Sequence, residues 1–190
     1  MHRVNFATGL LAWLAVATMF APPAQAGDHP HDRNGFMIGF SLGGGSQGIE
    51  DSDEREGSGT GNFRIGGAIR QDLVIAFEGQ GWSKTIEDPL GDFIWTFSTA
   101  TAAITVYPGG GGGFLRGGVG VGTASVEFDG GGFNVTADES GLAVLAAGGY
   151  EWRLTRKFAL GPHAEFVWMD LDEVGSANMV GGSLDFDWYW

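Results

Sequence analysis

Apolar and polar residues alternate in short segments along most of this chain. Successive side chains of a β-strand point to opposite faces, so alternation with a period of two predicts strands with one apolar and one polar face. The segment 178–190 shows the pattern most clearly. One of its faces carries Val180, Leu184, Phe186, Trp188 and Trp190, and the other carries Ser183, Asp185 and Asp187. The chain is therefore expected to consist of amphipathic strands.

Eight segments of this kind follow one another, at 35–43, 62–70, 73–82, 93–107, 114–127, 139–152, 158–169 and 178–190. Most reach the roughly 9–11 residues that a tilted strand needs to cross a bilayer. Their connections alternate between short turns, at 71–72, 108–113 and 153–157, and longer polar stretches, at 44–61, 83–92, 128–138 and 170–177. Short periplasmic turns and longer external loops are typical of outer-membrane barrels. The pattern predicts an all-β fold, an eight-stranded antiparallel up-and-down transmembrane β-barrel over residues 35–190.

The polarity of the two faces separates this barrel from a soluble one such as a lipocalin, in which apolar residues line the interior. Here one face of most strands is rich in Phe, Leu, Ile and Val. The other face mixes small residues with a charged set that we expect in the lumen: Arg64, Glu78, Arg116, Glu151, His163, Glu165, Asp185 and Asp187. Turning one Arg outward at the bilayer midplane would cost roughly 2–4 kcal/mol. An eight-stranded barrel has room for little more than side chains, so these charges are expected to plug it.

The fourth segment is the exception, because both of its faces are apolar. Trp95, Phe97 and Tyr107 share one face, whereas Ile94, Ile104 and Val106 share the other. The sequence therefore does not decide which face of this segment points into the lumen.

The N-terminus predicts export. An apolar run at 6–20 is followed by Ala-Pro-Pro-Ala-Gln-Ala at 21–26, which is typical of a signal peptide with its cleavage site. Residues 27–34 then form a polar segment, predicted to be a loose periplasmic arm. Its His29 and His31, with Asp28 and Asp32, could bind a metal, but a flexible arm does not pre-organise ligands and a disordered tail is the favoured interpretation.

Composition limits the partners. The net charge of −13 argues against nucleic acid, and the absence of Cys excludes disulfides. The longer polar stretches are acidic, with Arg55 and Lys84 as their only bases. These carboxylates could bridge divalent cations to lipopolysaccharide. Solvated loop charge is the favoured reading, because Asp51-Ser-Asp53-Glu54 lacks the full spacing of a calcium loop.

The signal-peptide-like start, the eight alternating segments and the terminal aromatics Phe186, Trp188 and Trp190 carry a family resemblance. The chain resembles the small bacterial outer-membrane β-barrels related to the membrane domain of OmpA and to OmpX, and its end resembles their C-terminal assembly signal. The resemblance implies a place in the bacterial outer membrane after export, handling by periplasmic chaperones and the barrel assembly machinery, and contact with outer-membrane lipid and lipopolysaccharide. It implies no cofactor and transfers no catalytic residue.

Two patterns suggest chemistry but are better explained by structure. His163 near Glu165 could serve acid–base catalysis, yet the His-x-Ser-Asn pattern of lipid A deacylase-like barrels is missing. Gly118-x-Gly120-x-Gly122 lacks the following helix that a nucleotide-binding loop requires. We therefore expect a non-enzymatic barrel with a structural or surface-interaction role. The alternatives are a narrow channel for small solutes and, less favoured, a lipid-modifying enzyme.

Overall fold

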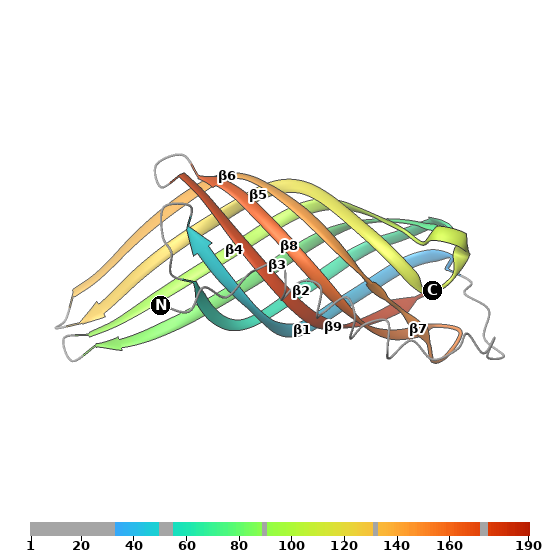
Figure 1. Ribbon diagram of the computed structural model, residues 1–190, viewed down its shortest axis with the longest axis horizontal. Helices are drawn as coiled ribbons and strands as arrows, with labels where there is room; N and C mark the ends of the chain where they lie inside the picture. The colour runs from blue at the N-terminus through green and yellow to red at the C-terminus, as the bar shows by residue number, and fades with distance from the viewer. Residues whose placement is uncertain (1–32, 50–54, 89–90, 131–132, 172–174) are drawn as a thin grey trace, which may run out of the picture. The chain divides into compact units, whose positions relative to one another are not determined.

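The computed structural model describes residues 33–49, 55–88, 91–130, 133–171 and 175–190, which form one antiparallel sheet closed on itself (Figure 1). Its strands are β1 (Gly35–Ile49), β2 (Glu56–Arg70), β3 (Leu73–Asp88), β4 (Gly91–Val106), β5 (Gly113–Gly130), β6 (Phe133–Tyr150), β7 (Trp152–Arg153), β8 (Phe158–Leu171) and β9 (Gly175–Tyr189). One 3-10 turn, η1 (Pro108–Gly110), follows β4. In these ranges no helix is long and apolar enough to span a membrane. The predicted signal peptide and the candidate metal ligands of the arm lie outside the described residues.

Each strand pairs with its neighbours along the chain, and the β1–β9 pair closes the ring. The short β7 continues β6, because both pair with β8 in one register, Gly149 opposite His163 and Trp152 opposite Leu160. Pro162 lies between these two pairs and has no N–H for the ladder, which accounts for the interruption. The wall therefore has eight strands, and the predicted barrel architecture is confirmed.

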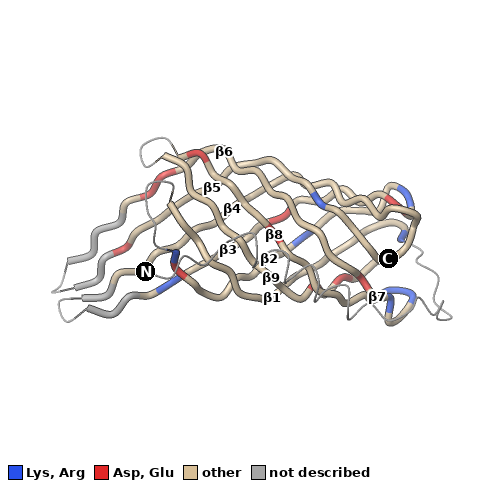
Figure 2. Tube along the Cα trace, in the orientation of Figure 1, with Lys and Arg blue, Asp and Glu red and all other residues tan. Residues whose placement is uncertain are grey.

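The two ends of the barrel differ. One end, called the turn end here, holds the short connections after β2, β4 and β7 and the last residue, Trp190 (Figure 1). Basic residues lie at this end, Arg156 and Lys157 in the connection after β7 and Arg70 and Arg153 at the last positions of β2 and β7 (Figure 2). The other end, the hairpin end, is where β1–β2, β3–β4, β5–β6 and β8–β9 turn back.

The strands are longer at the hairpin end than the sequence predicted. Most of 44–61, 83–92 and 128–138, which we expected to be loops, continues paired strands, and β8 and β9 also take up part of 170–177. The prediction of long loops there was wrong, because Gly and polar residues do not end a strand while its main-chain groups remain paired with a neighbour. Beyond the apolar wall, both faces of such a strand can be polar.

Two hairpins project further than the rest (Figure 1). Residues 83–88 of β3 extend past the last β2 pair, Thr60 with Trp82, and residues 133–140 of β6 extend past the last β8 pair, Gly141 with Leu171. Together with their partners in β4 and β5 they form a four-stranded extension, residues 83–88, 91–98, 123–130 and 133–140. Within the described residues both outer edges of this extension lack a neighbouring strand.

The outer wall is apolar, as its exposed side chains show. They include Phe36, Phe40, Leu42, Phe63, Ile65, Ile75, Phe77, Leu115, Val119, Val121, Leu142, Val144, Phe166, Val180 and Leu184. The open question of the fourth segment is also answered. Phe97 and Tyr107 are buried inside, whereas Ile104 and Val106 are exposed on the outer wall.

The interior is layered. A hairpin-end cluster consists of Trp82, Phe97, Ala103, Ala143, Leu145, Val167, Met169, Leu171, Ala177 and Met179. A turn-end cluster consists of Met37, Val74, Tyr107, Phe114, Ala159 and Tyr189. The inner face is therefore more apolar at both ends than the predicted mixture of small and charged residues.

Candidate functional site

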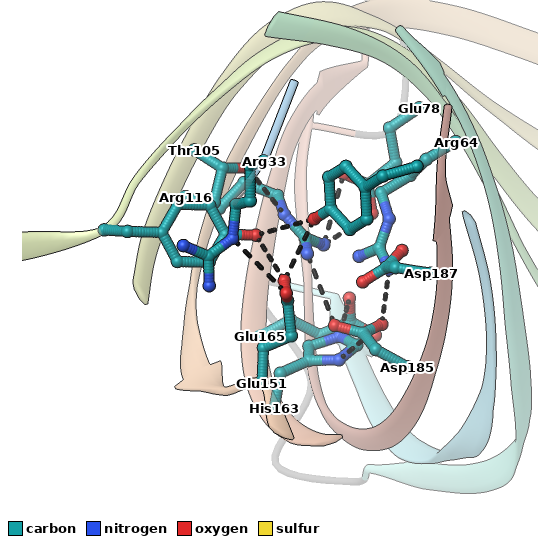
Figure 3. Close-up of polar contacts among 12 residues, drawn as sticks. Arg33, Arg64, Glu78, Thr105, Arg116, Glu151, His163, Glu165, Asp185 and Asp187 are labelled. Atoms are coloured by element: carbon teal, nitrogen blue, oxygen red, sulfur yellow. Dashed lines mark hydrogen bonds and ion pairs between the residues drawn. The ribbon is translucent and has the colours of Figure 1, made fainter. Parts of the chain in front are cut away.

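A charged layer lies between the two apolar clusters, and it contains the residues predicted for the lumen except Glu151, which lies beside Tyr107 and Tyr189 of the turn-end cluster. The eight predicted residues are buried, at most 5% exposed: Arg64, Glu78, Arg116, Glu151, His163, Glu165, Asp185 and Asp187. They come from β2, β3, β5, β8 and β9 and from the β6–β7 junction, so the layer exists only once the barrel has closed (Figure 3). Alternation alone directs each of them inward, because their neighbours in sequence face outward.

Asp185 is the centre of this layer. Its carboxylate lies 2.8 Å from Nη2 of Arg64, 3.3 Å from Nη2 of Arg116 and 3.1 Å from Nδ1 of His163 (Figure 3). Asp187, two residues further along β9, lies 2.8 Å from the same Arg64 nitrogen. One carboxylate thus joins cations from three strands.

Two interactions cross the lumen. Gln80 on β3 donates a hydrogen bond of 2.7 Å to Glu165 on β8, a strand on the opposite side of the ring. Arg116 on β5 bridges Glu78, at 3.2 Å, and Asp185. Buried charges require such pairing, because an isolated ion in a low-dielectric interior is very costly. These contacts tie opposite walls together.

The turn end is occupied by an arginine that we did not predict to be part of the site. Arg33 belongs to the predicted loose arm, yet its side chain is fully buried. Its Nε lies 3.3 Å from Glu151, its other nitrogens donate to the carbonyl oxygens of Gln71 and Gly111, and its guanidinium lies 3.4 Å from the ring centroid of Tyr107. The only signal in sequence was a single Arg placed just before the first strand.

Glu151 is held from several directions. The hydroxyl groups of Tyr107 and Tyr189 donate to its carboxylate at 2.7 and 3.0 Å, and Arg153 lies 3.8 Å away. The Arg33 guanidinium binds the carbonyl oxygens of the turns after β2 and β4, and the tyrosines link Glu151 to the end of β4 and to β9. They form a polar closure across the turn end of the barrel.

Charge in the interior is nearly balanced. Among the described residues, the buried Arg, His, Asp and Glu side chains are four arginines, His163 and five carboxylates. Both ring nitrogens of His163 face carboxylates, Glu165 at 3.2 Å and Asp185 at 3.1 Å. Ionised carboxylates only accept hydrogen bonds, so Nε2 can donate to Glu165, whereas the contact of Nδ1 with Asp185 is one of ion-pair distance only. A charged His163 would match five positive with five negative groups.

Glycine makes room for the ion pairs. A Cβ added at Gly39 on β1 would collide with the Asp187 carboxylate and lie 3.1 Å from Nε of Arg64. Gly39 faces Arg64 across β1–β2 and Asp187 across β1–β9. The absence of a side chain on β1 therefore lets both charged groups meet over it.

The site offers no arrangement suited to catalysis at a lipid. His163 contacts two carboxylates rather than a hydroxyl nucleophile, and its side chain is 0% exposed. An acyl chain at the outer wall could not reach it without opening the barrel. The geometry instead fits a structural polar network, in which each group restrains the others.

The C-terminal aromatics lie on the outer wall at the closing seam. Phe186 and Trp188 stack on Phe40 of β1, with ring centroids 5.4 and 5.2 Å apart. Trp188 also packs against Phe158, at 4.7 Å. Trp190 lies 5.9 Å from Phe36 and its backbone N–H donates to the Phe36 carbonyl. Ring contacts and a backbone hydrogen bond therefore hold the C-terminal residues against β1, the first strand.

No protein-family model matches this chain, and no curated protein sequence matches it significantly. Solved structures do match. The attachment invasion locus protein Ail of Yersinia pestis is 13% identical, with a TM-score of 0.63 over 82% of this chain and 99% of Ail. Neisserial surface protein A is 13% identical, with a TM-score of 0.62 over 84% of this chain and 99% of that protein.

The outer membrane protein OprG of Pseudomonas aeruginosa is 10% identical, with a TM-score of 0.50 over 86% of this chain and all of OprG. Ail has also been solved in complex with the heparin analogue sucrose octasulfate. The fold is therefore that of the small outer-membrane β-barrels, as the sequence resemblance implied, and it agrees with the predicted location in the bacterial outer membrane.

Proposed function

We propose that this chain is a non-enzymatic barrel of the bacterial outer membrane that interacts with other molecules at the cell surface through its four-stranded extension. The apolar outer wall suits lipid, and the charged layer suits a lumen that serves stability rather than transport. The hairpin end then faces the outside, because outer-membrane barrels keep their short turns in the periplasm. A structural contribution to membrane integrity is the alternative role.

The observation that carries the proposal is the pair of open edges on the extension. Residues 133–140 of β6 pair with β5 alone, and residues 85–88 of β3 pair with β4 alone, whereas Ser83 and Lys84 still contact Ser58 and Glu56 of β2. An unpaired strand edge presents a row of main-chain donors and acceptors, which is a template for adding an extended peptide. The long edge on β6 is comparable to a full strand of an ordinary sheet.

The negative charge of the four-stranded extension restricts the charge of the partner that it can bind. In sequence the extension has one base, Lys84, and seven acids: Glu87, Asp88, Asp92, Glu127, Asp129, Asp138 and Glu139. A sulfated ligand like the one bound to Ail would be repelled by this surface. We therefore expect a basic or uncharged extended segment of another protein, and no retention on heparin.

The interaction is tested by panning random ten-residue peptides against the mature chain refolded in lipid nanodiscs. The matched variant replaces residues 127–136 by Asn-Gly, which closes β5 and β6 at the Val126–Ala137 pair with a tight two-residue turn. Peptides that bind the parent and lose binding to the shortened variant support the proposal. Arg156→Ala, an exposed change at the turn end, serves as the control and should bind as the parent does.

Failure to enrich any peptide, or equal binding to the shortened variant, would sink the surface-interaction role. Cells expressing the shortened variant should also keep the detergent resistance of cells expressing the parent. If they lose it, the structural alternative gains support.

The closed lumen is tested separately by single-channel conductance of the refolded chain in planar bilayers. We expect no steady openings from the parent. Steady openings would favour the alternative function, a narrow channel for small solutes, and an Arg116→Ala variant would then show whether Arg116 lines the conducting path.

A further inference from the structure

Two exposed bases at the turn end have no acidic partner. Arg156 and Lys157 lie in the connection after β7, and no carboxylate of the residues that the structure describes forms an ion pair with either of them (Figure 2). Arg70, the exposed base at the end of β2, is by contrast paired with Asp72 at 2.9 Å. In a chain with a net charge of −13, two adjacent unpaired cations mark a surface that attracts an anion.

Hydrogen bonds fix the main chain of the turn that carries these bases. The Thr155 hydroxyl oxygen accepts from the backbone N–H groups of Lys157 and Phe158, at 3.2 and 2.9 Å. The N–H of Thr155 donates to the carbonyl oxygen of Phe158. The guanidinium of the buried Arg153 donates to the Arg156 carbonyl oxygen at 2.7 Å. The turn therefore presents both bases at a fixed place on the rim of the barrel.

The bases lie at the edge of the apolar outer wall. Lys157 is followed directly by Phe158, whose ring packs against Trp188 with centroids 4.7 Å apart. Trp152 of β7 and Trp190 at the end of the chain belong to the same stretch of wall. Aromatic side chains of membrane barrels gather at the boundary between hydrocarbon and headgroups. Cations that directly follow such a belt therefore lie at the height of the lipid phosphates.

The side of the rim formed by β2 to β5 lacks this combination. Its outward side chains near the turn end are aliphatic, and they include Ile69, Ile75, Val106 and Leu115. Its exposed base, Arg70, already has a carboxylate partner. On the other side Leu154, which is 50% exposed in the turn after β7, adds apolar surface that lipid can cover. Within the described residues, unpaired cations and an aromatic wall meet on that side alone.

We propose that the turn after β7 is a binding site for an anionic phospholipid in the leaflet that meets the turn end, the periplasmic leaflet in the proposed orientation. The lipid phosphate binds Arg156 and Lys157, both of which donate hydrogen bonds to phosphate oxygens. The acyl chains run over the outer wall past Phe158 and Trp188. A zwitterionic headgroup fits less well, because it brings a cation of its own next to two unpaired bases. The site does not depend on the surface-interaction role, since it lies at the other end of the barrel.

Quenching of tryptophan fluorescence by brominated lipid tests the site. The mature chain is refolded into phosphatidylcholine vesicles that contain a minor fraction of phosphatidylglycerol, and folding is checked by the heat-dependent shift in gel mobility. Bromine is placed on the acyl chains either of the phosphatidylglycerol or of an equal amount of the phosphatidylcholine. The difference in quenching measures how strongly the protein prefers the anionic lipid.

The variants leave every tryptophan in place. A double variant, Arg156→Gln with Lys157→Gln, removes both bases of the site. Lys157→Gln and Arg70→Gln form a matched pair, because each removes one exposed base at the turn end and only the first of them belongs to the site.

We expect the parent to prefer phosphatidylglycerol by at least about fivefold, since one basic residue near an anionic membrane surface contributes about that factor. Lys157→Gln should lower the preference, the double variant should abolish it and Arg70→Gln should keep it. High salt should weaken it, because salt screens exposed charges. No preference in the parent, an unchanged preference in the double variant, or an equal loss in Arg70→Gln would each overturn the proposal.

Stability gives a second measurement. Adding phosphatidylglycerol should raise the urea midpoint of the parent and leave that of the double variant unchanged, because a ligand of the folded state stabilises it. In lipid without net charge, changes at Arg156 and Lys157 should alter neither stability nor peptide binding at the hairpin end, so Arg156→Ala remains a control there. A failed peptide-binding experiment would leave the lipid preference unchanged, so the two proposals fail separately.

Discussion

The guanidinium of Arg33 lies 3.3 Å from the carboxylate of Glu151, although 117 residues separate them and Arg33 precedes the first strand. The contact joins the arm before β1 to the junction of β6 and β7. A segment that the sequence presents as a polar tail thereby becomes part of the barrel interior.

Arg33→Ala is expected to lower the free energy of unfolding by about 3 kcal/mol, because removing one partner of a buried ion pair leaves the other charge uncompensated. Glu151 keeps its two tyrosine donors, which limits the loss. Urea unfolding of the refolded chain, followed by tryptophan fluorescence, measures the change. Arg156→Ala, exposed at the same end, should stay within about 0.5 kcal/mol of the parent. A similar small effect for Arg33→Ala would mean that the arm does not stabilise the barrel.

The charged layer predicts unequal costs for two neighbouring carboxylates. Asp185→Leu should destabilise the barrel more than Asp187→Leu, since Asp185 faces Arg64, Arg116 and His163 whereas the pair described for Asp187 is with Arg64. Each loss is expected to reach several kcal/mol, because it leaves a buried cation without its partner. Urea unfolding of the two variants, side by side, checks the order.

A double-mutant cycle separates the pair from the rest of the layer. Arg64→Met with Asp187→Leu should cost less than the sum of the two single changes by about 1 kcal/mol or more, because coupled contacts are not additive. Additive costs would show that Arg64 and Asp187 do not stabilise each other.

The strand count, the up-and-down order and the inward charges followed from alternation, because a period of two assigns each residue to a face without knowledge of its neighbours. The same reasoning failed for the fourth segment. Phe97 and Ile104 are both apolar, and the choice between lumen and lipid depended on Trp82 lying opposite Phe97 in the folded wall. The register between two strands cannot be predicted from the sequence of one of them.

The hairpin end and Arg33 show two other limits. Ser83 was expected in a loop, yet it pairs with Thr96 across β3 and β4, since hairpin pairing satisfies its main chain. Arg33 lies in a segment without periodicity, so no pattern directed it inward. Its position is set by Glu151 and Tyr107, which come together only when the ring closes.

Gly39 is expected to tolerate no side chain. Gly39→Ala would push a methyl group into the Asp187 carboxylate, so the Arg64–Asp187 pair must shift, at a cost of about 1–3 kcal/mol. Gly81→Ala on β3 is the matched control, because a Cβ there would meet nothing within 4 Å and should be neutral or slightly stabilising. The two midpoints of urea unfolding give the comparison. If both variants unfold like the parent, the lumen is looser than these contacts imply.

The closing seam gives the last prediction. Trp188 contacts two rings, Phe40 of β1 and Phe158 of β8, and such aromatic pairs contribute about 0.5–1.5 kcal/mol each beyond their buried area. Trp188→Ala should therefore lower the free energy of unfolding by at least about 1 kcal/mol more than Phe166→Ala, which removes an aromatic ring from the same outer wall. It should also slow the appearance of the compact, heat-modifiable form during refolding into vesicles, because the β1–β9 pair is the step that closes the ring. If the two variants have equal stability and equal refolding rates, the ring contacts between the last strand and its neighbours do not stabilise the closed barrel. Contact with lipid alone would then explain the aromatic C-terminus.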